Sequence, residues 1–76
     1  MLTDMQERCL VVLEKLGKVT ANELAMFFYT QGYTKFFNRN YVHPRLNELV
    51  KIGYVYEAGK KTDNITGKTC TIYAKV

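Results

Sequence analysis

The sequence has few of the side chains that bind metals. It contains one histidine, His43, and two cysteines, Cys9 and Cys70, which lie near opposite ends of the 76 residues. Because a structural zinc site takes about four ligands, the sequence predicts no bound metal, and we expect no cofactor. Both thiols are expected to stay reduced and to pack as small apolar groups.

Long apolar runs are also missing. No stretch approaches the roughly 20 apolar residues that span a membrane, and the first residues do not resemble a signal peptide. We therefore expect a cytoplasmic protein without a membrane partner. The sequence also lacks a carboxylate pair or a nucleophile–base pair that would indicate an enzyme.

Charge is present but uneven along the chain. The net charge is +4, yet residues 1–34 carry three basic and four acidic groups, whereas residues 35–76 carry eight basic and three acidic groups. A basic half on a small domain favours a polyanionic partner such as nucleic acid. The alternative is that the charge serves solubility alone.

The hydrophobic pattern predicts one α+β domain over residues 1–76. Thr3 and Gln6 form a capping-box spacing for a helix that ends at Leu16, and Thr20 and Glu23 form another for a helix from Ala21 to Tyr29 or Thr30. A third helix is expected to begin between Asn38 and Val42 and to end at Ile52, with Pro44 near its start. The expected buried stripes are Met5, Cys9, Val12, Leu13 and Leu16; Leu24, Phe27 and Phe28; and Val42, Leu46, Leu49 and Val50.

After Gly53 the period changes to two, which predicts strands over residues 54–57 and 70–76. The stretch GKKTDNITGKT, residues 59–69, lies between them and is expected to form a projecting loop. Its TGKT ending is similar to that of a phosphate-binding loop. That motif needs a glycine at position 62, which is threonine, and a helix afterwards, so a nucleotide site is excluded.

The run VHPRLNELVKIGYV, residues 42–55, resembles the winged helix-turn-helix superfamily, in which an RL-x-EL helix leads into a hairpin. Together with TGKT it is similar to small DNA-binding proteins of phages and prophages. The resemblance implies three helices plus a C-terminal β-hairpin wing. It also implies a transcriptional or phage regulator that puts a recognition helix, about residues 38–52, into the major groove of double-stranded DNA, and a wing, residues 57–70, on the phosphate backbone.

Residues near the start of that helix are the expected base readers, because amide and guanidinium groups pair with base edges. One of Asn38 and Asn40 is expected to cap the helix instead. The candidate base-reading residues are Asn38, Arg39, Asn40, Tyr41, His43 and Asn47.

Basic and hydroxyl side chains are the expected phosphate contacts. For Arg45 an i,i+3 ion pair with Glu48 is equally expected. The candidate phosphate-binding residues are Lys35, Arg45, Lys51, Lys60, Lys61, Thr66 and Lys68.

Six aromatic rings crowd into eleven residues before the third helix. We favour the interpretation that they fill the core. The alternatives are a homodimer or protein-partner contact, which would make the domain an interaction module, and stacking on single-stranded bases. The six are Phe27, Phe28, Tyr29, Tyr33, Phe36 and Phe37.

Overall fold

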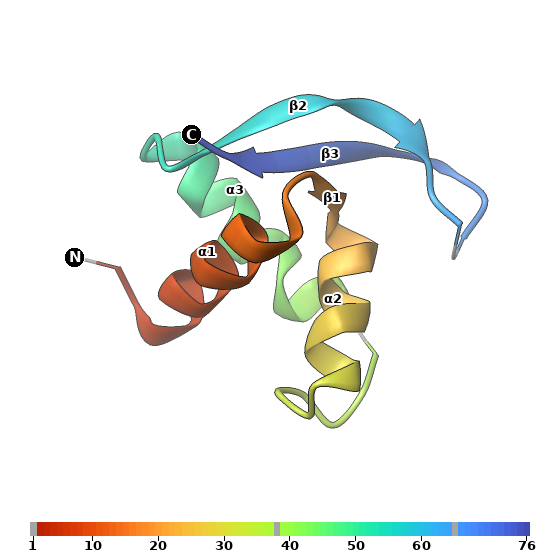
Figure 1. The fold of residues 1–76 in the computed structure, drawn as a ribbon, viewed down its shortest axis with the longest axis horizontal. Coiled ribbons are helices and arrows are strands. Elements are labelled where there is room, and N and C mark those ends of the chain that lie inside the picture. Colours follow the sequence, from red (N-terminus) through yellow and green to blue (C-terminus); the bar gives the residue numbers. More distant parts are fainter. Residues whose placement is uncertain (1, 38, 65) are drawn as a thin grey trace.

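The computed structural model describes residues 2–37, 39–64 and 66–76, which form three α-helices and a three-stranded antiparallel sheet (Figure 1). The α+β class is therefore confirmed. No helix among these residues is long and apolar enough to cross a membrane. The elements are α1 (Asp4–Leu16), β1 (Val19–Thr20), α2 (Ala21–Thr30), the 3-10 helix η1 (Arg39–Tyr41), α3 (His43–Lys51), β2 (Val55–Thr62) and β3 (Thr69–Lys75).

Both predicted capping boxes are present. The backbone N–H of Gln6 donates to Thr3 Oγ1 over 3.2 Å, and the N–H of Thr3 donates to Gln6 Oε1 over 2.9 Å. Thr20 and Glu23 make the same reciprocal pair at the start of α2. These four bonds satisfy backbone donors that have no partner inside a helix, so the two starts were predictable from sequence.

The start of α3 differs from the prediction. Residues 39–41 form η1, and α3 begins only at His43, with Val42 as its N-cap and no side-chain cap bond. The expectation that one of Asn38 and Asn40 caps the third helix is not met for Asn40, since Val42 is the N-cap of α3; Asn38 lies outside the described residues. Pro44 lies in the first turn as predicted. Because proline has no N–H, it removes one of the donors that a cap would satisfy.

The hairpin is longer and its loop shorter than predicted. β2 continues to Thr62, so Gly59–Thr62 is strand and not loop. A bulge between Glu57 and Gly59, with φ of 132° at Gly59, lets β2 bend while it stays paired with β3. The sequence favoured a loop because glycine and lysine are depleted in strands, but pairing with β3 outweighs that preference.

A short strand between the first two helices completes the sheet; the sequence indicated a short extended segment there, at Lys18 and Val19, but not the strand with which it pairs. In β1, Val19 lies opposite Tyr73 and Thr20 opposite Ile72, which gives the strand order β1-β3-β2. The central strand β3 contacts α1 and α2, and Tyr73 joins the core. Leu16, expected in the core, is 36% exposed. The core comprises Cys9, Val12, Leu13, Ala21, Leu24, Ala25, Phe28, Val42, Leu46, Leu49, Val55 and Tyr73.

Candidate nucleic-acid interface

The start of α3 and the hairpin strand β3 border one hollow. Its volume is about 210 Å³, and the first turn of α2 forms its third side. Two of the segments that the sequence singled out for DNA contact therefore lie next to each other. The lining residues are Ala21, Asn22, His43, Thr69, Cys70, Thr71 and Tyr73.

The described base-reading candidates lie on η1 and α3. Asn40 and Tyr41 are exposed on η1, and Asn47 is exposed on α3. His43 is half-buried where it lines the hollow. Arg39 begins η1, whereas Asn38 lies outside the described residues. The described members of the set other than Asn47 are thus grouped at the start of α3, and Asn47 lies one turn further along.

Asn47 has a partner from the core. The Tyr73 hydroxyl donates to Asn47 Oδ1 over 3.4 Å, while the rest of the Tyr73 side chain is buried. Because Oδ1 accepts this bond, the amide nitrogen of Asn47 is directed elsewhere. With its oxygen held by Tyr73, Asn47 can offer its amide N–H groups to a hydrogen-bond acceptor on a ligand.

The hairpin gathers Lys60, Lys61, Thr66 and Lys68, all of them exposed. Lys61 forms an ion pair with Glu23, with 2.7 Å between Nζ and Oε2. The other carboxylate oxygen of Glu23 accepts the N–H of Thr20, so one side chain both caps α2 and holds β2. Lys61 is therefore less available to a phosphate than Lys60 or Lys68.

The remaining phosphate candidates lie away from the hairpin. Lys51 is exposed at the end of α3, and Lys35 is exposed in the loop between α2 and η1, at the far end of the molecule from the sheet (Figure 1). The structure brings neither of them together with the hairpin lysines.

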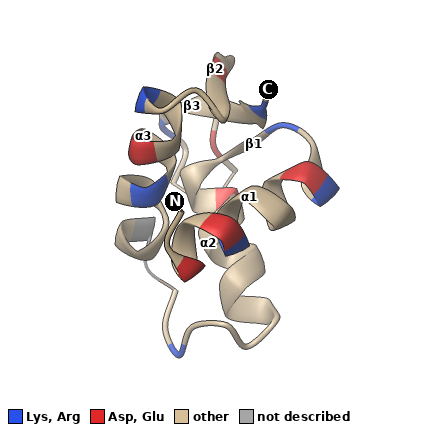
Figure 2. Ribbon diagram, turned by 90° about the vertical axis from the view of Figure 1, so that its left-hand side faces the viewer, with Lys and Arg blue, Asp and Glu red and all other residues tan. Residues whose placement is uncertain are grey.

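Arg45 forms the ion pair with Glu48 that was the alternative to a phosphate contact. Its Nε and Nη2 donate to the two carboxylate oxygens of Glu48 over 2.8 and 3.0 Å. Hydrogen bonds from Arg45, and then from Gln6, lower the pKa of the Glu48 carboxyl. Figure 2 shows that basic, acidic and basic positions follow one another along α3. A phosphate would have to compete with Glu48 for Arg45.

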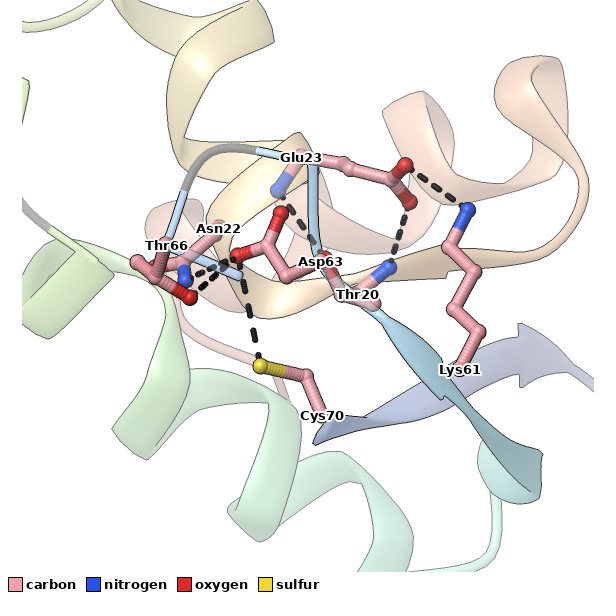
Figure 3. Close-up of polar contacts among 7 residues, drawn as sticks. All are labelled: Thr20, Asn22, Glu23, Lys61, Asp63, Thr66 and Cys70. Atoms are coloured by element: carbon pink, nitrogen blue, oxygen red, sulfur yellow. Dashed lines mark hydrogen bonds and ion pairs between the residues drawn. The ribbon is translucent and has the colours of Figure 1, made fainter. Parts of the chain in front are cut away.

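A polar cluster around one buried carboxylate, which we call the tip clasp, holds the end of the hairpin against α2 (Figure 3). Asp63 is fully buried and accepts a hydrogen bond from Nδ2 of Asn22. Thr66 Oγ1 and Cys70 Sγ also donate to Asp63, over 3.4 and 3.9 Å. The sequence does not indicate this cluster, because aspartate is a common turn residue and no local pattern relates Asp63 to Asn22.

The aromatic cluster is only partly buried. Phe28 is fully buried, but Tyr29 is 46% exposed, Tyr33 45% and Phe36 68%. The expectation that the core takes these rings is therefore wrong for three of the six. Tyr33 packs edge-on against Phe28 at 5.4 Å between centroids, and the Arg8 guanidinium lies 4.8 Å from the Tyr33 ring centre.

The two cysteines are free thiols. Cys9 is in the core, where burial raises the pKa of its thiol to about 12, and Cys70 is half-buried in the tip clasp. Within the described ranges, no three histidine, cysteine or acidic side chains are grouped to hold a metal ion.

Comparisons with known proteins do not guide the interpretation of this site. Comparisons with protein-family models, with curated proteins and with solved structures found no match to this chain. Its function is therefore inferred from residue chemistry and geometry.

Proposed function

We propose that this chain is a sequence-specific double-stranded DNA-binding protein of the winged helix-turn-helix type. The η1–α3 segment is its recognition helix and the β2–β3 hairpin is its wing. The observation that supports this most directly is the hollow that His43 shares with Thr69 and Thr71, since it makes the start of α3 and the hairpin neighbours on one surface.

The chemistry of each element suits its proposed role. An α-helix fits the major groove, where amides such as those of Asn40 and Asn47 discriminate bases by their donors and acceptors. Ammonium groups on the hairpin contact phosphates without reading sequence. A small domain thus has one element for sequence and another for affinity. A regulatory role in a phage or another mobile element, and a cytoplasmic location, belong to this proposal through the resemblance of residues 42–55.

Duplex binding measured against salt tests the proposal. With about four to six phosphate contacts, log K should fall with log[salt] at a slope of about −4 to −5. Fluorescence anisotropy with a random duplex between 50 and 200 mM salt measures that slope, and selection of bound sequences then identifies the preferred site. Absence of binding at the lowest salt would reject the proposal.

A protein-interaction module on the same fold is the second candidate. It is favoured by the exposure of Tyr29, Tyr33 and Phe36, which lie on and after α2, away from the hairpin. Exposed aromatic side chains are enriched at protein interfaces. In that case the chain would dimerise or bind a protein without retarding DNA, and Phe36→Ala would weaken that association while Lys60→Ala would not.

A further inference from the structure

We propose that the Asn22–Asp63 pair positions the basic end of the hairpin for phosphate contact, with Asp63 as a positioning residue that itself touches no DNA. This inference rests on the proposed DNA-binding function. It concerns how Lys60 and Lys68 are held, not whether their charges are attractive to DNA.

Asp63 is the exception within an exposed turn. It is fully buried, and Asn22 is only 3% exposed, whereas Asn64, Thr66, Gly67 and Lys68 are exposed. A buried carboxylate is costly unless donors surround it. Here Asn22, Thr66 and Cys70 donate to one of its oxygens. The turn is thus attached to the body of the protein through one well-satisfied side chain.

The outer part of the hairpin pairs with no third strand among the described strands. β1 pairs only with Ile72 and Tyr73, so the segments Lys60–Thr62 and Thr69–Thr71 pair with each other alone among the described strands. A two-stranded ribbon is marginally stable and twists readily. The ion pair between Lys61 and Glu23 and the tip clasp both connect this ribbon to α2.

The basic side chains are coupled to the clasp through the backbone. The N–H of Asp63 donates to the carbonyl of Lys68 over 2.8 Å, and the N–H of Gly67 donates to the carbonyl of Asp63 over 2.8 Å. Fixing the Asp63 side chain therefore fixes the turn that carries Lys68. The same α2 turn lines the hollow beside His43, so the clasp relates the hairpin to the start of α3.

A hairpin held in this way binds without first being ordered. Ordering a mobile segment on binding costs free energy and weakens affinity. With the clasp closed, Lys60 and Lys68 meet the backbone together while α3 occupies the groove. With the clasp open, the hairpin contributes fewer simultaneous phosphate contacts, although no charge has been removed.

An exchange of the two side chains tests the clasp. Asn22→Asp makes two carboxylates face each other and breaks the pair, and the double variant N22D/D63N restores one amide and one carboxylate with their roles exchanged. In the free protein, N22D should accelerate hydrogen exchange at the Gly67 amide about tenfold, and the double variant should reverse this. Asn64→Ala, in the same turn but exposed, is the matched control and should change nothing.

The DNA readout separates positioning from plain destabilisation. N22D should reduce the magnitude of the salt slope by about 1 to 2, since each lost phosphate contact removes about 0.9, and the double variant should recover it. The selected base sequence should not change. If N22D does not fold, as judged by circular dichroism, Asn22→Ala removes the donor alone and is measured in its place.

The outcomes are distinct. A folded wild-type protein that does not bind duplex DNA overturns the proposed function and the positioning role with it. Wild-type binding with an unchanged slope and unchanged Gly67 exchange in N22D overturns the clasp alone. Faster exchange with an unchanged slope shows that the clasp orders the turn without setting phosphate contacts, which also overturns the inference.

Discussion

Gln6 in α1 donates a 2.8 Å hydrogen bond to Glu48 in α3 across 42 residues of sequence. Glu48 also accepts both bonds from Arg45, so a single carboxylate joins the capping box of α1 to the exposed side of α3. The helix that we propose for the major groove is thereby attached to α1 by a polar contact beside the apolar core. That contact depends on the charge of Glu48.

Acid should loosen this attachment. The hydrogen bonds from Arg45 and Gln6 lower the pKa of Glu48 in the folded state. The stability that ionised Glu48 contributes is complete above the pKa of the unfolded chain, about 4.3. It is lost as pH falls through the lower pKa that Glu48 has in the folded protein. As pH is lowered from 6 to 3, the melting temperature should therefore fall more steeply for wild type than for Glu48→Gln. Parallel profiles for the two proteins would count against the contact.

Alkali should weaken the core through Cys9. Burial raises the pKa of this thiol to about 12, well above its value in an unfolded chain. A raised pKa gives stability that is complete below the unfolded pKa, about 8.5, and is lost above it, by at most about 1.4 kcal/mol per pH unit. Urea unfolding from pH 7 to 10 should show this decline in wild type and in the control Cys70→Ala, and a smaller decline in Cys9→Ala. An equal decline in Cys9→Ala would contradict the assignment.

The two neighbouring lysines of β2 should differ in their effect on DNA binding. Lys60→Ala should reduce the magnitude of the salt slope by about 0.9, the value of one phosphate contact. Lys61→Ala should reduce it less, because the ion pair with Glu23 already occupies that ammonium group. Lys15→Ala, on the last turn of α1, provides the control for net charge. This prediction is refuted if anisotropy titrations show a larger change in salt slope for Lys61→Ala than for Lys60→Ala.

The sequence predicted what depends on neighbouring residues. The capping boxes at Thr3 and Thr20 were predictable because both partners lie within one turn. The Arg45–Glu48 pair was predictable as an alternative for the same reason. The buried residues of α3 followed from its period, and Val42, Leu46 and Leu49 are indeed fully buried.

What the sequence did not predict depends on contacts between distant residues. The pairing of β1 with β3 involves only two residues of β1, too few to give a periodic signal. The extension of β2 through Gly59 needs the partner strand to outweigh turn-forming residues. Asp63 and Asn22 are 41 residues apart, and each is typical of a turn or a helix start when seen alone. These are the features that decide how the proposed interface is held.

Burial of the aromatic rings divides them into two groups with different effects. Phe28 is fully buried, so Phe28→Ala should cost about 3 to 5 kcal/mol of unfolding free energy through lost transfer and a cavity. Phe36, at 68% exposure, should change stability by no more than about 0.5 kcal/mol when replaced by alanine. Urea unfolding of both variants measures the difference. A large loss in Phe36→Ala would mean that this ring packs in solution.

The hydroxyl of Tyr73 should affect which sequence is bound more than how tightly. It donates to Asn47 Oδ1 over 3.4 Å, and Tyr73→Phe removes this bond while keeping the ring in the core. If Asn47 reads a base, its amide then loses a fixed orientation, and preference at one base position should relax, by up to about the 1 to 3 kcal/mol of a good base contact. The salt slope should stay at the wild-type value, because no phosphate contact is removed.

Selection of bound sequences by wild type, Tyr73→Phe and the reference variant Asn47→Ala measures the preference. Both variants should relax the same position, and an unchanged preference in Tyr73→Phe would show that Asn47 is not oriented from the core.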